Sequence, residues 1–152
     1  MTIAVDFDGT IVKHDFPRIG KEIPFAVDTL KTFVSEGHRV ILWTSRKGDA
    51  LKAAVDWCAE RGLNFYAVNS NYPDLSIVPK EKRHESGKVV ADVYIDDRNL
   101  GGLPEWGEIY SMVTGRHKRY IMTNSRRIKL KIAARVDKIL GLFANNRKSP
   151  RD

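Results

Sequence analysis

Hydrophobic positions along this chain alternate between short continuous runs and longer stretches with a period of three to four residues. The runs are rich in Ile, Val and Leu, which is typical of strands buried on both faces. The periodic stretches are typical of amphipathic helices, and Gly37 and Gly62 follow them as plausible ends. We therefore expect strands over about residues 2–7, 39–44, 64–68 and 91–95, and helices over about 25–36 and 50–61, the second capped by Asp49.

The alternation of strands and helices predicts βαβ units, a parallel sheet and right-handed crossovers, and so an α/β protein. Residues 10–24 and 69–87 are polar, contain prolines and are expected to be irregular. The stretch at about 104–114 is either a short helix or, over 109–113, a fifth strand. A last amphipathic helix is expected at about 125–143.

Charge divides the chain unevenly. Residues 116–152 contain 12 Lys and Arg but only 2 Asp and Glu, whereas residues 1–115 contain 14 basic and 17 acidic side chains. We expect residues 1–115 to form the core and residues 116–152 to form a basic helical extension of the same domain. Such a helix could dock on its own domain or on a sister subunit, or contact nucleic acid or a membrane surface; we place self-docking or oligomer contact first and nucleic acid second.

The length of 152 residues predicts one domain. No run approaches the ~18 apolar residues of a membrane span, and the first strand begins at once, without a signal peptide. Cys58 is the single cysteine, so no internal disulfide forms, and its helical context predicts a buried thiol. These features predict a cytoplasmic protein.

Two strands end in acidic pairs. Asp6 and Asp8 follow the first strand, and Asp96 and Asp97 follow the strand at 91–95. In an open α/β sheet, ligands bind at the carboxyl ends of the strands. Four carboxylates there would repel one another unless a cation compensates them, and Mg²⁺ prefers oxygen ligands of this kind.

The segment Asp6-Phe7-Asp8-Gly9-Thr10 resembles the first motif of the haloacid dehalogenase superfamily, the aspartate-nucleophile phosphatases. The family's other motifs follow in order over residues 3–98: a Thr or Ser ending a strand, a Lys, and an acidic pair. Thr44 fits the second, with Ser45 less suited to it, Lys88 the third and Asp96-Asp97 the fourth. The resemblance implies a three-layer, Rossmann-like sandwich with central strand order 3-2-1-4. The gaps between motifs leave little room for an inserted domain, so we expect minimal or no cap.

The resemblance also implies a Mg²⁺-dependent phosphomonoester hydrolase that acts through an aspartyl-phosphate. Asp6 would be the nucleophile and Asp8 the general acid and base. The metal would be held by Asp6, the backbone carbonyl of Asp8, and Asp96, with Asp97 behind them. Lys88 would also be catalytic, because its charge would touch both Asp6 and a phosphate oxygen. Substrate phosphate would be bound by Lys88, Thr44 and Ser45.

Other interpretations remain. Arg46 and Arg98 lie beside the motifs and either bind substrate or form structural ion pairs. His14 and the other three histidines show no ligand spacing and are assigned to surface or structural roles. The chain could also act on nucleotides or nucleic-acid ends through its basic tail, or be a non-catalytic binding protein. Without a cap, selectivity would come from residues 10–24, from residues 69–87 or from a homo-oligomer interface, and the substrate is expected to be a small phosphate ester.

Overall fold

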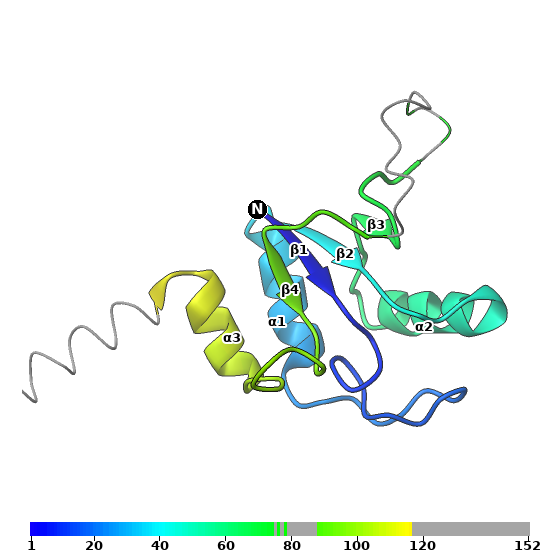
Figure 1. Cartoon of the computed structure of the whole chain (residues 1–152), viewed down its shortest axis with the longest axis horizontal. Coiled ribbons are helices and arrows are strands. Elements are labelled where there is room, and N and C mark those ends of the chain that lie inside the picture. Colours follow the sequence, from blue (N-terminus) through cyan, green and yellow to red (C-terminus); the bar gives the residue numbers. More distant parts are fainter. Residues whose placement is uncertain (75, 77, 79–87, 117–152) are drawn as a thin grey trace, which may run out of the picture. The chain divides into compact units, whose positions relative to one another are not determined.

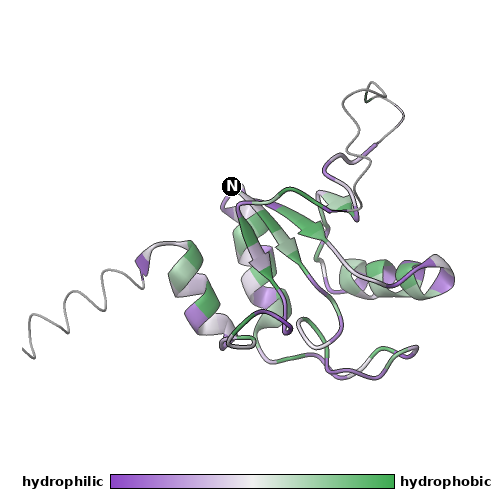
Figure 2. Cartoon of the chain, in the orientation of Figure 1, coloured by the Kyte–Doolittle hydropathy of each residue, from purple (hydrophilic) through white to green (hydrophobic). Residues whose placement is uncertain are grey.

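A computed structural model describes residues 1–74, 76, 78 and 88–116 of the chain. Its four strands form one parallel sheet in the order β3-β2-β1-β4, as expected (Figure 1). Their bounds are β1 Thr2–Val5, β2 Arg39–Leu42, β3 Ala67–Val68 and β4 Val93–Ile95. The apolar runs that predict them lie along the sheet in Figure 2, and Ile3, Val5, Val40 and Leu42 are fully buried.

Helix α1 (Ala26–Ser35) buries Ala26, Leu30 and Phe33, which recur every three to four residues on one face. Figure 1 shows this helix running behind the sheet. The helix ends where expected, because Gly37 has a φ of 82°, a conformation that glycine adopts without strain.

Helix α2 (Gly48–Glu60) buries Ala54 and the thiol-bearing Cys58, as predicted. Burial raises the pKa of Cys58 to about 12, so its thiol stays protonated and unreactive. The expected cap is wrong: Asp49 lies inside the first turn, and the helix follows Lys47 with no side-chain capping bond.

The stretch whose structure stayed ambiguous in the sequence is a helix, α3 (Trp106–Val113). It is anchored by Trp106, a buried side chain whose indole N–H donates to the carbonyl oxygen of Thr10 at 3.2 Å. Tyr110 stacks on Phe33 of α1 with ring centroids 5.8 Å apart. This contact packs α3 against α1. Because Trp106–Val113 is helical, the alternative of a fifth strand over 109–113 is wrong.

The two faces of the sheet are covered differently. The connections through α1 and α2 step in the same direction across the sheet, so right-handed crossovers place both helices on one face. The connection from β3 back to β4 must then cross the other face. There Val89 packs with Ala4, Ile41 and Ala67, in a cluster that contains no residue of α1, α2 or α3. The α/β sandwich is thus confirmed, and the described part of its second covering layer is non-helical.

The chain divides into two compact units, Met1–Tyr110 and Ser111–Asp152. Of the second unit, the structure describes only residues 111–116, which continue and end α3. The helix expected at 125–143, and with it the basic extension, lies outside the described residues. Within the described ranges, none of the helices has the length and apolar character that a membrane span requires.

Candidate functional site

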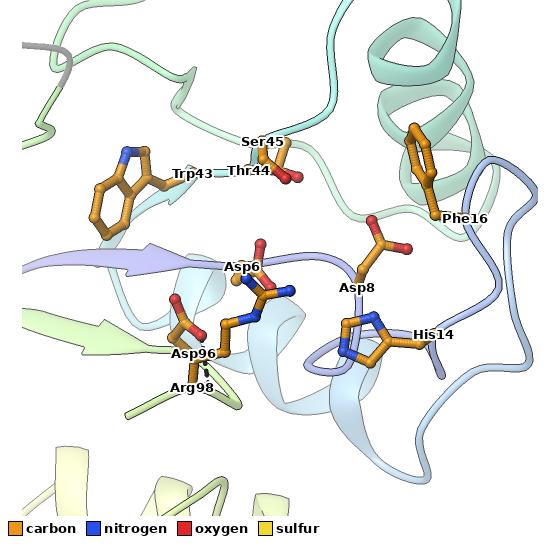
Figure 3. Close-up of a pocket in the computed structure, with 9 residues that line it drawn as sticks. All are labelled: Asp6, Asp8, His14, Phe16, Trp43, Thr44, Ser45, Asp96 and Arg98. Atoms are coloured by element: carbon orange, nitrogen blue, oxygen red, sulfur yellow. Dashed lines mark hydrogen bonds between the residues drawn. The ribbon is translucent and has the colours of Figure 1, made fainter. Parts of the chain in front are cut away.

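The acidic pairs meet because their strands are neighbours in register. Val5 of β1 pairs with Ile95 of β4, so Asp6 and Asp96 are the next residues on adjacent strands. The backbone N–H of Asp6 continues the ladder by donating to the carbonyl oxygen of Ile95 at 3.0 Å. One carboxylate oxygen each of Asp6, Asp96 and Asp97 lies within 4.8 Å of the others. Figure 3 shows Asp6 and Asp96 side by side at these strand ends.

Asp6 is the most strongly perturbed member of this cluster. Its pKa is raised from the usual 3.8 to about 6, chiefly by burial and also by the neighbouring charges of Asp96, Asp97 and Asp8, against a hydrogen bond from the backbone of Phe7 that lowers it. The ionised form of Asp6 is therefore costly in the protein alone. A bound cation would remove that cost by compensating the charge.

Asp97 supplies a second sign that the cluster is built for a cation. Its Oδ1 is buried and has no hydrogen-bond partner among the described residues, while its Oδ2 is 3.0 Å from Nε2 of His14. A buried carboxylate oxygen without a partner is costly unless a ligand satisfies it. The donor set of three carboxylates also suits a hard divalent ion. Asp97, which the sequence analysis placed behind the metal ligands, is therefore one of three residues, with Asp6 and Asp96, that could hold an ion directly.

Gly9 allows this close approach. Its φ is +86°, and a Cβ at this position would collide with Asp97 Oδ2 and His14 Nε2. Both the backbone conformation and the lack of space therefore require glycine. Thr10, the next residue, is fully buried and accepts a hydrogen bond on its hydroxyl from the backbone N–H of Asp97 at 3.1 Å. The turn after β1 is thereby tied to the turn after β4.

Asp8 has a different environment from the other three aspartates. Both of its oxygens accept hydrogen bonds from Arg46, from Nε at 2.6 Å and from Nη2 at 2.7 Å. Arg46 is only 1% exposed and also donates to the main-chain oxygens of Pro17 and Arg18, at 3.1 and 2.7 Å. Arg46 therefore forms a buried structural ion pair, which is one of the two roles that the sequence left open for it.

Thr44 lines the pocket with a hydroxyl that is free to donate. Its oxygen accepts from the backbone N–H of Arg46 at 3.3 Å, which leaves the hydroxyl proton available for a ligand. Its own backbone N–H donates to Oδ1 of Asn69 at 2.8 Å. Asn69 follows β3 with a φ of 48°, a conformation for which Asn is enriched. Sequence reasoning missed this positioning residue, although an Asn directly after an apolar run was the available signal.

The two basic side chains expected near the site, those of Lys88 and Arg98, lie in different places. Lys88 is exposed, its ammonium lies 5.9 Å from the ring centroid of Tyr94, and it does not line the pocket. Arg98 does line the pocket, and its backbone N–H donates to Oδ1 of Asp96 at 2.8 Å. Among the described residues that line the pocket, Arg98 is the one with a permanent positive charge.

These side chains enclose one pocket of about 530 Å³ at the carboxyl edge of the sheet (Figure 3). Five of the seven predicted site residues line the pocket, and Asp97 and Lys88 do not. The five are Asp6, Asp8, Thr44, Ser45 and Asp96. Sequence reasoning did not place His14 and Phe16, which come from residues 10–24, or Trp43, which directly follows β2, in the site. The lining consists of Asp6, Asp8, His14, Phe16, Trp43, Thr44, Ser45, Asp96 and Arg98.

The fold and the pocket define an α/β protein that carries an acidic cluster at the carboxyl edge of a parallel sheet. A similar solved structure is that of a conserved protein from Bacteroides thetaiotaomicron. It shares 55% sequence identity with this chain and has a TM-score of 0.69, with 76% of this chain and 91% of that chain covered. The chain belongs to the same family as that conserved protein. No family model matches the chain, and no curated protein matches it.

Proposed function

We propose that the protein is a Mg²⁺-dependent phosphomonoester hydrolase of the haloacid dehalogenase type that acts through an aspartyl-phosphate on Asp6. The observation that carries the proposal is the cluster of Asp6, Asp96 and Asp97 within 4.8 Å, in a pocket shared with the hydroxyl of Thr44. This cluster joins residues about ninety positions apart, in the arrangement that the motif order implies.

Asp6, Asp96 and Asp97 are the residues to hold the metal. When bound, Mg²⁺ supplies positive charge that offsets the repulsion between the Asp6 carboxylate and a substrate phosphate. Arg98 adds charge to the same volume, and Thr44 donates its hydroxyl proton to a phosphate oxygen.

The reaction has two balanced steps. An Oδ of Asp6 attacks phosphorus, the bond from phosphorus to the ester oxygen breaks, and Asp8 gives a proton to that oxygen. Water then attacks the phosphorus of the acyl-phosphate, Asp8 takes a proton from it, and inorganic phosphate leaves with the Asp6 carboxylate restored. Asp8 approaches the leaving oxygen by exchanging one of its two bonds to Arg46.

The test is hydrolysis of an aryl phosphate with added Mg²⁺, by the full chain and by Asp6→Asn. Asp6→Asn loses turnover, and acid quenching of the unaltered chain traps a protein that is heavier by one phosphoryl group. Asp49→Asn, an exposed aspartate in the first turn of α2, is the matched control and keeps activity. Substantial turnover by Asp6→Asn would remove Asp6 as nucleophile.

A non-catalytic binding role is the second candidate. Two observations favour it: both Asp8 oxygens are bonded to Arg46, and Lys88 does not line the pocket. A chain that binds Mg²⁺ but hydrolyses nothing across a broad phosphate panel would support this role instead.

A further inference from the structure

Phe16 is an apolar side chain left in water at the edge of a polar pocket. The residue is 65% exposed although it lines the pocket beside Asp6 and Asp8. Leaving most of a phenylalanine ring in water forfeits most of the free energy that its burial would contribute. A ligand that binds in this concave site would pack on the exposed ring and remove it from water.

The ring contacts a buried guanidinium. The guanidinium carbon of Arg46 lies 5.2 Å from the centroid of the Phe16 ring, within the range of a cation–π contact. Arg46 itself donates hydrogen bonds to Asp8 and to the main-chain oxygens of Pro17 and Arg18, the two residues that follow Phe16. One side of the ring is thus supported, and the exposed remainder is presented on an anchored backbone.

The position of the ring suits a leaving group. Arg46 contacts both the Phe16 ring and the Asp8 carboxylate, so a group lying on the ring would hold its ester oxygen close to Asp8. Figure 3 shows Phe16 on the side of the pocket nearer Asp8, with Trp43 on the opposite side. The pocket volume of about 530 Å³ greatly exceeds the space that a phosphoryl group needs, which leaves room for a ring beside it.

We propose that Phe16 is a specificity-determining platform, and that the substrate is a phosphomonoester whose leaving group carries a flat aromatic or heteroaromatic ring stacked on it. The inference rests on the proposed function and adds the substrate class. A flat ring is favoured over a saturated one because aromatic pairs gain about 0.5–1.5 kcal/mol beyond the area they bury.

The test compares benzyl phosphate with cyclohexylmethyl phosphate, which have leaving groups of similar size and reactivity but differ in the ring. The full chain with Mg²⁺ prefers the benzyl ester in kcat/KM. Phe16→Leu, which keeps an apolar side chain, lowers that preference about 2- to 10-fold. Phe16→Tyr, which keeps an aromatic ring, retains the preference. Phe25→Leu is the matched control: Phe25 is 70% exposed but does not line the pocket, and its replacement leaves the preference unchanged.

An equal loss on both esters in Phe16→Leu would overturn the platform, because it would mean that Phe16 only supports Arg46 and Asp8. If the full chain hydrolyses neither ester, the proposed reaction fails, and the platform is judged by calorimetric binding of the matching phosphonates, which cannot be hydrolysed. Tighter binding of benzylphosphonate that Phe16→Leu abolishes would still support the platform. Equal or absent binding of the two phosphonates would overturn it.

Discussion

At the scale of single residues, the protein makes ionisation of the Asp6 carboxyl costly, and this cost should be visible in the stability of the fold. The pKa of Asp6 is raised from 3.8 to about 6, chiefly by burial. A carboxyl whose pKa rises on folding favours the folded state when it is protonated. Its stabilising effect is complete below about pH 4 and is lost as the pH rises through about 6.

We therefore expect Asp6→Asn to be more stable than the unaltered chain at pH 8 in the presence of a chelator, and we expect the difference to shrink towards pH 4. Urea midpoints measured across this range test the expectation. Asp49→Asn serves as the control and shows no such gain on raising the pH. Addition of Mg²⁺ at pH 8 stabilises the unaltered chain and reduces the advantage of Asp6→Asn. A difference that does not vary with pH would contradict the raised pKa.

The proposed reaction also needs a basic side chain that binds the substrate phosphate. Arg98 lines the pocket, whereas Lys88 lies near Tyr94. We expect Arg98→Ala to lower kcat/KM about 10- to 100-fold, the loss of a charge-assisted hydrogen bond, and to weaken inhibition by inorganic phosphate. Lys88→Ala is the comparison, and we expect a smaller effect. The reverse order would mean that Lys88 reaches the phosphate in the working protein, as the resemblance implies.

Sequence reasoning succeeded for residues whose role follows from their place on a strand. Asp6 and Asp96 end apolar runs, so their meeting follows from the strand order alone. The partnership of Asp97 with His14 and the exposure of Phe16 depend on how residues 10–24 fold back over the site. No periodicity describes that irregular segment, and for this reason the sequence could nominate it without assigning its side chains.

At the scale of elements, residues 10–24 are attached to the strand ends through Arg46. This buried guanidinium joins Asp8 to the carbonyl oxygens of Pro17 and Arg18. Removing one partner of a buried ion pair leaves the other charge without compensation.

We expect Arg46→Ala to lower the free energy of unfolding by about 3–5 kcal/mol. Arg46→Lys should rescue little of it, because an ammonium cannot pair with both oxygens of a carboxylate in a planar fork. Chemical denaturation measures both. Arg18→Ala removes an exposed ion pair with Asp15 and should leave the free energy of unfolding nearly unchanged, because exposed ion pairs contribute little. A near-neutral Arg46→Ala would show that the contacts of Arg46 contribute little.

Element types were more predictable than element ends. Strands β1 and β2 end two residues earlier than expected, at Val5 and Leu42, because the chain leaves the ladder there to form the site. Strands β3 and β4 end where expected but begin later, at Ala67 and Val93. Helix α3 could not be told from a strand because Ile109 and Tyr110 suit both. Its assignment depends on tertiary contacts of Trp106 and Tyr110 with residues far away in the sequence.

At the scale of the whole molecule, the order of the four strands followed from the motif order, and this is the part of the fold that the site requires. The function of the basic extension remains a prediction, because it falls outside the described residues. The excess of positive charge in residues 116–152 would attract nucleic acid by releasing counterions.

Fluorescence anisotropy with a labelled oligonucleotide tests this role of the extension. If nucleic acid is the partner, affinity falls steeply as salt rises and disappears when residues 116–152 are deleted, while hydrolysis of a small ester persists. Binding that is insensitive to salt, or that survives the deletion, would contradict the electrostatic role. A change in mass in solution on deletion would instead favour contact between subunits.

The way in which Arg46 holds residues 17 and 18 has a consequence for how this protein can change. Arg46 grips this segment by two main-chain oxygens, Pro17 O and Arg18 O, which any amino acid at those positions would also offer. The attachment therefore does not depend on which side chains the segment carries. Position 16 can therefore be exchanged without removing those two bonds. In the proposed hydrolase, single substitutions there would change which leaving groups fit, while the attachment of the loop and the proposed catalytic residues stay the same.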